Sequence, residues 1–419
     1  MYPLLLGLAG FTMLALFRGH ALPDLFTMML KGSRQSLLVI RIFVLIGIIT
    51  AVWRACGTIP FIVYYSTAYL NEQFFVLSAF LLSCLMSLLL GTSFGTVGTM
   101  GVILMVVARS GQVDINVAAG AIIAGAYFGD RCSPMSSSAN LVAILTGTRL
   151  YLNLANMFKT SVLPFILTCV GYAAFSLKHP LIGDDNPIVA AIPQAFNLHP
   201  IVALPAVLIL AMAAKRIDVK LSMGISSLAG MGTAVLEQQV SPSELWRYIA
   251  TGYQMNQSGP LSTVMQGGGL LSMLQVSLIV LISSAYSGLF AGTGLLRDVE
   301  SAYELISRKV GIYSATVLTS FATAAFSCNQ ALAIMLTQQL IHGAYDKMRI
   351  SRYRLALDIE NSVIVISALI PWNIAGAVPA AALSADSGFI PYALYLYFVP
   401  LTYFITRKSS IRESHHESS

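Results

Sequence analysis

The chain has 419 residues, of which 56% are hydrophobic and only 10% charged, and its mean hydropathy is +0.76. A soluble domain needs far more charged surface, so the composition predicts an all-α polytopic membrane protein embedded in a lipid bilayer. The net charge of +6 does not indicate a nucleic-acid partner, because the basic residues stand in short clusters between apolar segments. No His/Cys metal cluster, nucleotide-binding loop or nucleophile triad appears, so neither an enzyme nor a cofactor is expected.

The charge distribution along the chain predicts its orientation. The first apolar run, Tyr2 to Phe17, has no charged region before it and is interpreted as a membrane helix, not a cleaved signal peptide. By the positive-inside rule, the clusters rich in Lys and Arg face the cytoplasm. These clusters are Arg18 to Arg34, Arg149 to Lys159, Lys215 to Lys220, Arg297 to Lys309, Lys347 to Arg354 and Arg407 to Arg412. The prediction is a multi-pass protein of a bacterial-type cytoplasmic (inner) membrane with a cytoplasmic C-terminus.

Two apolar segments do not fit as simple crossings. Residues 74–108 begin and end on the outer side, and residues 313–341 begin and end on the inner side, if the loop charges are followed. Each holds roughly 30 residues, whereas two full crossings need about 40. Both segments are therefore predicted to be re-entrant hairpins, with tips near Gly91 to Gly98 and Ser327 to Gln330.

A long segment with a polar interruption follows each hairpin. Residues 117–148 are broken at Asp130 to Asn140, and residues 355–383 are broken near Glu360 to Asn373. Helix, hairpin and broken transmembrane helix thus occur twice, starting from opposite sides, which predicts inverted structural repeats. The expected layout is an N-terminal membrane helix with a cytoplasmic loop (1–34), a first repeat (35–178), a connecting loop with scaffold helices (179–246), a second repeat (247–406) and a cytoplasmic tail (407–419).

These paired interruptions predict a solute-binding site, because backbone at membrane depth leaves the helix only where it lines a cavity or is buried in protein. Asp130 and Glu360 are the acids nearest the two breaks, and an unpaired carboxylate in a membrane costs at least ~2.5 kcal/mol. Alternatives remain open: Asp130 pairs with the adjacent Arg131, and Asp358 pairs with the basic loop ending at Arg354. The predicted substrate- and ion-binding residues are Thr92, Ser93, Thr96, Asp130, Ser133, Ser136, Ser137, Asn140, Ser327, Asn329, Gln330, Glu360, Asn361, Ser362 and Asn373.

Three stretches carry a family resemblance. Gly91 to Thr99 (GTSFGTVGT), Gly125 to Pro134 (GAYFGDRCSP) and Leu369 to Asn373 (LIPWN) resemble the NhaC-type sodium/proton antiporters of the ion transporter superfamily, and the similarity runs from about Leu25 to Phe404. The resemblance implies inverted repeats, elevator-like movement of a transport module against a scaffold, a homodimer, and Na⁺ or H⁺ as the coupling ion. Relatives include carriers of malate and lactate or of amino acids.

The chain departs from the family pattern at three acidic positions. An aspartate is usual in the family where this chain has Ser137, Asn329 and Asn361. These neutral residues, together with Asn140, can still coordinate Na⁺ through oxygen, but they cannot carry an exchanged proton.

A base also stands where the family has an apolar residue, at Arg54. Arg54 and Arg131 are candidate anion contacts, although Arg54 can instead extend to the membrane interface. The predicted function is ion-coupled transport of a small organic anion or amino acid. The alternative is genuine Na⁺/H⁺ exchange through Asp130 and Glu360. A channel or a membrane enzyme is less favoured, since interrupted helices in inverted halves suit alternating access.

Overall fold

The computed structural model describes residues 2–69, 72–181, 187–215, 217–255, 260–293 and 309–407, together with Tyr303 and Ser307. Within these residues the regular structure is helical, apart from one isolated bridge between Tyr253 and Gly267. The α-helices are α1 (Tyr2–Phe17), α2 (Leu22–Ala55), α3 (Thr58–Tyr69), α4 (Phe75–Leu90), α5 (Ser93–Thr96), α6 (Val102–Ser110), α7 (Ile115–Cys132), α8 (Ser137–Thr146), α9 (Leu150–Lys178), α10 (Pro187–Ala195), α11 (Leu204–Ala214), α12 (Val219–Glu237), α13 (Pro242–Thr251), α14 (Pro260–Met265), α15 (Leu270–Thr293), α17 (Ile312–Ser327), α18 (Gln330–Lys347), α19 (Arg352–Glu360), α20 (Val363–Ile366), α21 (Ile374–Ala382) and α22 (Leu394–Thr406). Shorter turns are η1 (Glu72–Phe74), a π-helix η2 (Val97–Gly101), η3 (Pro200–Ala203), η4 (Ser367–Leu369) and η5 (Ser387–Tyr392).

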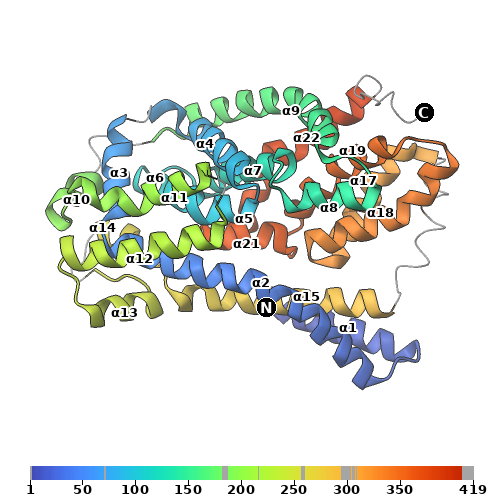
Figure 1. Ribbon diagram of the computed structural model, residues 1–419, viewed down its shortest axis with the longest axis horizontal. Helices are drawn as coiled ribbons and strands as arrows, with labels where there is room; N and C mark the ends of the chain where they lie inside the picture. The colour runs from blue at the N-terminus through green and yellow to red at the C-terminus, as the bar shows by residue number, and fades with distance from the viewer. Residues whose placement is uncertain are drawn as a thin grey trace.

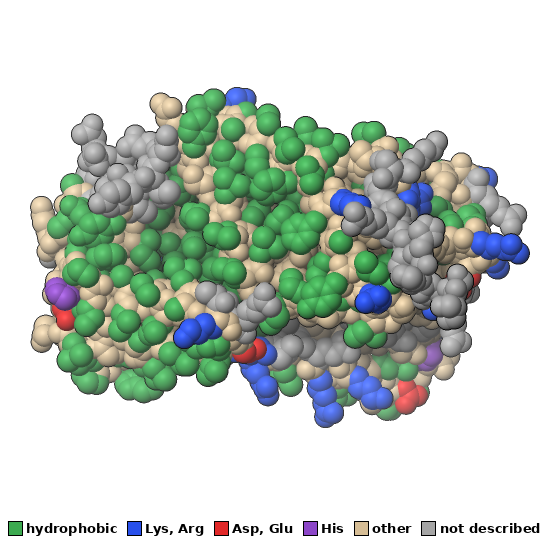
Figure 2. Space-filling model, turned by 45° about the horizontal axis from the view of Figure 1, so that its top comes forward, with side chains coloured by type: hydrophobic (Ala, Val, Ile, Leu, Met, Phe, Trp, Pro, Cys, Tyr) green, Lys and Arg blue, Asp and Glu red, His purple; other side chains and the backbone are tan. Residues whose placement is uncertain are grey.

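The helices are apolar enough for a polytopic membrane protein. Ser93–Ser110 and Leu150–Lys178 are each long and apolar enough to cross a bilayer, with mean hydropathies of 1.4 and 1.6. Two bent pairs also qualify, Ile40–Ala55 with Thr58–Tyr65 at 69° and Arg352–Leu369 with Ile374–Ala382 at 53°. Figure 2 shows hydrophobic side chains covering most of one face, while Lys and Arg side chains gather mainly towards the right-hand end of that view. The all-helical membrane class is therefore confirmed.

The helices form two layers (Figure 1). Along the lower edge α2 and α15 run side by side, with α1 packed at one end and α12 and α13 at the other. The second layer is built on the contact between α4 and α7, which α9 and α22 cover, and α8, α17, α18 and α19 pack together at its far end. Helix α21 contacts both α15 and α7, so it lies between the layers. The largest core cluster is centred on α4, α6, α7, α21 and α22.

Helices α4 and α7 pack so closely because small residues face each other. A Cβ on Gly129 would lie 2.1 Å from the carbonyl carbon of Ser87, so only glycine fits there. The Ser87 hydroxyl donates a hydrogen bond to the carbonyl oxygen of Ala126 on α7. Small residues spaced four apart, as at Gly125 and Gly129, allow this approach between apolar helices. The glycines of α7 thus bring its backbone close to that of α4.

The two hairpins turn with the same backbone conformation. After α4, Gly91 adopts φ 67° and ψ 19°, and Thr92 then adopts φ −147° and ψ 131°. After α17, Cys328 adopts φ 54° and ψ 5°, and Asn329 adopts φ −144° and ψ 131°. A side chain at Gly91 would meet the carbonyl carbon of Met135 at 2.6 Å, which makes glycine necessary at this turn. The chain therefore repeats one turn conformation in its two halves; that the flanking helices are re-entrant hairpins and that the halves are inverted in the membrane stay predictions, and Ser93–Ser110 is by itself long enough to cross.

The two helix breaks also share a pattern. Ser133, in extended conformation before Pro134, ends α7, and Ser136 then caps α8 by accepting a hydrogen bond from the amide of Ala139 at 3.2 Å. In the second half, Ile370 is extended before Pro371, and Asn373 caps α21 through the amide of Ala375 at 2.9 Å. In both halves a proline two residues before a capping side chain ends one helical segment and starts the next.

Three sequence predictions require correction. Residues 22–34 are helical and not a loop, because α2 begins at Leu22, where Pro23 occupies its first turn, and continues through Lys31, Gly32 and Arg34; their cytoplasmic side stays a prediction. The basic stretch Arg149 to Lys159 is likewise mostly the first part of α9. Clusters of basic residues predict which side of the membrane a segment faces, but they do not by themselves end a helix.

The first hairpin tip is also shorter than predicted. It is confined to Gly91 and Thr92, while Gly95 and Gly98 lie within α5 and η2. The acidic pair Asp184 and Asp185, most of the 297–309 segment and the tail after Arg407 lie outside the described residues.

Candidate functional site

The buried carboxylate of Asp130 lies where the two hairpin turns meet. Asp130 is in the last turn of α7, just before the break, and only 4% of it is exposed. The Gln330 side chain, at the start of α18, donates from Nε2 to Asp130 Oδ2 at 3.3 Å. The backbone of Ser93, at the start of α5, interacts electrostatically with the same carboxylate. Ser93 and Gln330 follow the two equivalent turns, so the halves of the chain converge on one acid.

Most hydroxyls and amides around the first break bond to backbone. The side chains of Ser136 and Ser138 both donate to the carbonyl oxygen of Asp130, and Ser133 donates to that of Leu88 at 2.8 Å. Asn140 donates to the carbonyl of Ser136 at 2.6 Å. These residues therefore hold the break in shape. Ser137 differs, because it is exposed and borders a cavity.

At the second break, as at the first, most polar side chains are hydrogen-bonded to backbone groups. Asn329 accepts from the amide of Ala331 at 2.9 Å and so caps α18, and Ser327 donates to the carbonyl of Asn329 at 3.0 Å. Ser362 donates to the carbonyl of Asp358 at 2.6 Å. Asn373 donates to the carbonyl of Ala324 at 2.7 Å and so ties α21 to α17. Similarly, Thr96 of the first hairpin donates to the carbonyl of Thr92 at 2.9 Å.

Glu360 is the exception at this break. It is the last residue of α19, it is fully buried, and neither carboxylate oxygen accepts a hydrogen bond from any described residue. Its electrostatic neighbours are Arg131, which attracts it, and Asp130, which repels it. A buried carboxylate without a hydrogen-bond donor needs a proton, a cation or a ligand to compensate its charge. Glu360 and Asp130 therefore form one electrostatic unit across the two breaks.

Arg131 is the permanent positive charge of this unit. The side chain is fully buried, and its Nη2 donates to Asn361 Oδ1 and to Thr160 Oγ1, the latter at 2.9 Å. Its Nη1 donates to the hydroxyls of Ser161 and Tyr395, the latter at 3.1 Å. Arg131 Nε and Asn361 Nδ2 have no partner among the described residues. Among the described residues Arg131 forms no ion pair with Asp130, so the alternative in which these neighbours neutralise each other is not observed.

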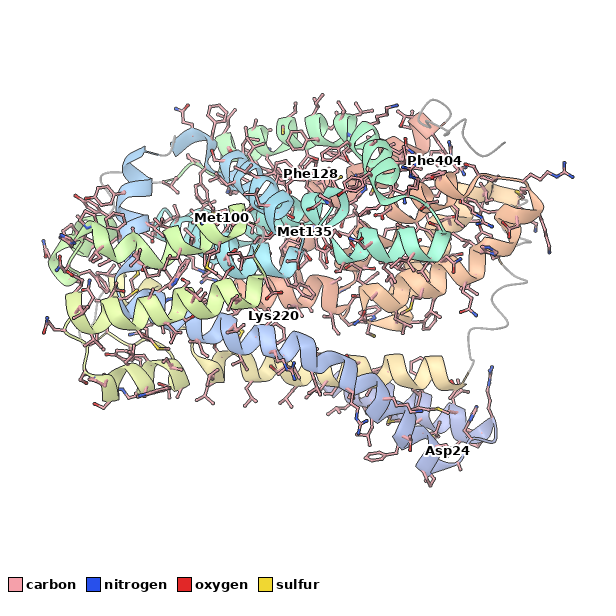
Figure 3. All side chains as sticks on the ribbon, in the orientation of Figure 1. Asp24, Met100, Phe128, Met135, Lys220 and Phe404 are labelled. Atoms are coloured by element: carbon pink, nitrogen blue, oxygen red, sulfur yellow. The ribbon has the colours of Figure 1, made fainter. Side chains whose placement is uncertain are left out.

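A cavity of about 410 Å³ lies beside the first break and the first hairpin turn. Thr92 and Ser137 line one side, together with Met135, and Lys220 at the start of α12 lines the other; Figure 3 labels Met135 and Lys220. This volume falls in the range of small-molecule sites and far exceeds the need of a bare ion. The cavity thus adjoins the turn that leads into Ser93 and its contact with Asp130.

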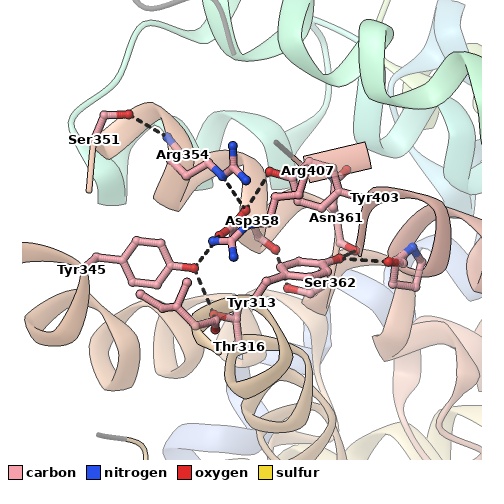
Figure 4. A network of polar contacts seen from close by, with 12 residues as sticks. Tyr313, Thr316, Tyr345, Ser351, Arg354, Asp358, Asn361, Ser362, Tyr403 and Arg407 are labelled. Atoms are coloured by element: carbon pink, nitrogen blue, oxygen red, sulfur yellow. Dashed lines mark hydrogen bonds and ion pairs between the residues drawn. The ribbon is translucent and has the colours of Figure 1, made fainter. Parts of the chain in front are cut away.

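Asp358, two residues before Glu360, has a different environment (Figure 4). It accepts hydrogen bonds from the hydroxyls of Tyr345 at 2.6 Å and Tyr403 at 2.7 Å. It also forms ion pairs with Arg407 at 2.6 Å and with Arg354 at 3.5 Å. The predicted pairing with the basic loop at Arg354 is thus present, and every side of this carboxylate is occupied. Asp358 is a structural acid.

Comparison with known proteins decides the family. The sequence profile of the Na⁺/H⁺ antiporter family matches residues 125–407, about two thirds of the chain, including both breaks and the second hairpin. The chain belongs to the Na⁺/H⁺ antiporter family. The resemblance given by the three motifs is therefore confirmed, and the protein is an integral membrane antiporter-family transporter.

This antiporter-family chain is similar to transporters of different named cargo. It is 27% identical over 383 residues to the Na⁺/H⁺ antiporter NhaC of Alkalihalophilus pseudofirmus, covering 90% of this chain and 83% of that protein. It is 24% identical over 390 residues to the malate-2H⁺/Na⁺-lactate antiporter of Bacillus subtilis, covering 91% and 83%. It is 26% identical over 412 residues to the arginine/ornithine antiporter ArcD of Halobacterium salinarum, covering 95% and 83%.

Sequence reasoning missed some residues of this antiporter's site. Lys220 was assigned only to a basic loop, although it lines the cavity opposite Ser137. Tyr395 is not among the predicted site residues, although its hydroxyl accepts a hydrogen bond from Arg131. Neither stands next to a helix breaker, so no local signal marks them. Arg54, in contrast, lines a different cavity, which is described below.

Proposed function

We propose that this protein is an ion-coupled antiporter whose cargo is a small organic anion or amino acid, with Asp130 and Glu360 carrying the coupling ion. The observation that supports this proposal most directly is that the two buried carboxylate oxygens of Glu360 have no hydrogen-bond partner among the described residues. A group that alternately binds and releases H⁺ or Na⁺ must be free of permanent partners, and Asp358 on the same helix lacks that freedom.

The organic cargo is supported by the cavity and by its charges. A volume of about 410 Å³ accommodates a solute of several non-hydrogen atoms. Lys220 on its lining supplies a cation for a carboxylate, Asp218 supplies a carboxylate for a cationic group, and Thr92 and Ser137 supply hydroxyls, a set that suits an amino acid as well as an anion. Arg131 contacts the neutral amide of Asn361, so Glu360 is the acid that attracts this guanidinium and residue 361 adds no second negative charge.

Na⁺/H⁺ exchange is the second candidate, because Asp130 and Glu360 are two buried acids that interact electrostatically. The predicted neutral Na⁺ ligands support it less well. Asn361 Oδ1 accepts from a guanidinium, and a cation beside Arg131 would be repelled. Asn329 uses its oxygen to cap α18. The elevator-like movement, the homodimer and the inner-membrane location remain parts of the same proposal.

Flux measurements in proteoliposomes test this function. Labelled malate, lactate and arginine are offered while Na⁺ and pH gradients are imposed separately. We expect gradient-driven uptake of at least one solute, and Glu360→Gln should abolish its response to the coupling gradient. Asp346→Asn is the matched control, because Asp346 is 56% exposed and far from both breaks in the sequence.

Two outcomes would contradict the proposal. Gradient-driven uptake that is unchanged in both Glu360→Gln and Asp130→Asn would remove the coupling role of these acids. Robust Na⁺-driven proton flux in vesicles free of organic solute, without uptake of any solute in the panel, would establish the second candidate instead.

A further inference from the structure

A second, smaller cavity lies where the ends of several helices meet. It has a volume of about 50 Å³, and its lining comes from the last turns of α2 and α21, from one side of α6 along its length and from the start of α15. It shares no lining residue with the cavity beside Thr92 and Ser137. It is therefore separate from the cavity assigned to the cargo.

Two arginines line this small cavity. Arg54 on α2 donates from Nη1 to the carbonyl of Thr50 at 2.8 Å, whereas its buried Nε has no partner among the described residues. Arg109 on α6 donates from Nη2 to the carbonyls of Leu383 and Ser384 at 3.3 and 2.7 Å. Across the described ranges, neither guanidinium forms an ion pair with a carboxylate.

This arrangement needs a negative charge. The two guanidiniums repel each other electrostatically, and an arginine does not escape repulsion by losing its proton. The start of α15 adds to the positive potential, because Ser272 and Met273 of its first turn line the same cavity and the amino end of a helix carries a partial positive charge. No acid among the lining residues offsets these three contributions.

The size of the cavity defines the ligand. A water molecule occupies about 30 Å³ in the liquid, so a cavity of about 50 Å³ holds one compact group and not a whole organic solute. We propose that Arg54 and Arg109 bind one small anion between them, either chloride or the carboxylate group of a small acid. Arg54 belongs to the layer of α2 and α15, and Arg109 to the layer built on α4 and α7. The bound anion connects the two layers.

Anion-dependent thermal stability of the purified full-length protein tests this site. The protein is kept in a bulky sulfonate buffer (HEPES) free of chloride and carboxylates, and chloride or acetate is titrated at constant ionic strength. We expect a saturable rise in Tm, and Arg54→Gln and Arg109→Gln should each weaken the apparent affinity at least about tenfold, since each removes a charged hydrogen-bond donor. Arg247→Gln is the matched control, because Arg247 is exposed and lines neither cavity.

Further variants keep the test decisive. If a glutamine variant does not fold, Arg54→Lys and Arg109→Lys retain the charge but lose the planar donor geometry, and they should still weaken binding. A response to chloride alone identifies an inorganic anion, and a response to acetate alone identifies a carboxylate; either supports the site. No response to either anion, or a response that persists in both arginine variants, overturns it.

The outcome is distinguishable from that of the proposed function. Glu360→Gln changes the unit at the helix breaks and should leave the rise in Tm intact. A rise that is lost in Glu360→Gln but kept in Arg54→Gln would assign the anion to the central site and refute this inference. The flux measurements above do not depend on either result.

Discussion

Two acids on one helix, Asp358 and Glu360, should respond to neutralisation in opposite ways. Asp358→Asn keeps the side-chain shape but removes the charge that two tyrosine hydroxyls and two arginines contact. Breaking a buried ion pair costs about 3–5 kcal/mol. The side chains of Arg354 and Arg407 are 15% and 20% exposed, so solvent screens them in part, and we expect a loss at the lower end, about 3 kcal/mol.

Glu360→Gln removes no hydrogen bond, because neither carboxylate oxygen has a partner among the described residues. Its effect on stability should therefore lie within about 1 kcal/mol, while gradient-driven transport is lost. The assay is the apparent Tm of both purified variants, beside flux normalised to the amount of folded protein in the vesicles. A stable Asp358→Asn variant, or a Glu360→Gln variant as unstable as Asp358→Asn, would refute the assignment of a structural and a functional acid.

Three further changes test the geometry of the site. Gly91→Val should abolish transport and lower the Tm, because residue 91 has a positive φ and lies against the first helix break; circular dichroism melting and flux measure both effects. Lys220→Gln should raise the KM for an anionic solute about tenfold with little change in Tm, whereas the exposed Lys215→Gln should not, and equal KM values would exclude Lys220 from binding. Asn361→Asp should place a carboxylate against the Arg131 guanidinium and so weaken anion uptake in the flux assay, and unchanged uptake would show that this charge does not act on the cargo.

The positions of the breaks and turns could be predicted from sequence because their signals are local. Pro134 and Pro371 restrict the residue before them, and Gly91 allows a turn that other residues do not. The free or bonded state of each polar group could not be predicted. Asn329 and Glu360 both flank a break, but only the three-dimensional packing gives one a backbone amide to cap and leaves the other without a donor.

Long-range contacts explain the remaining differences between the sequence predictions and the structure. The partners of Arg131 come from α9, α22 and the residue after α19, which are far apart in the chain. The helical continuity through Lys31 and Arg34 is likewise set by packing of α2 against α15, and not by the charges that suggested a loop. A sequence pattern identifies where regular helix is interrupted, whereas the distribution of partners depends on the whole fold.

The shared contact at Asp130 has a consequence for the tightness of coupling. One carboxylate interacts with the helix starts that follow both turns, through a hydrogen bond from the side chain of Gln330 and electrostatically with the backbone of Ser93. Binding or release of an ion at Asp130 would therefore change the contacts of this acid with both helix starts at once. An exchanger leaks when its two barriers open independently, and slippage of this kind dissipates the ion gradient without moving cargo. If the turns after α4 and α17 belong to the two barriers, a single acid that interacts with both would prevent the barriers from opening independently.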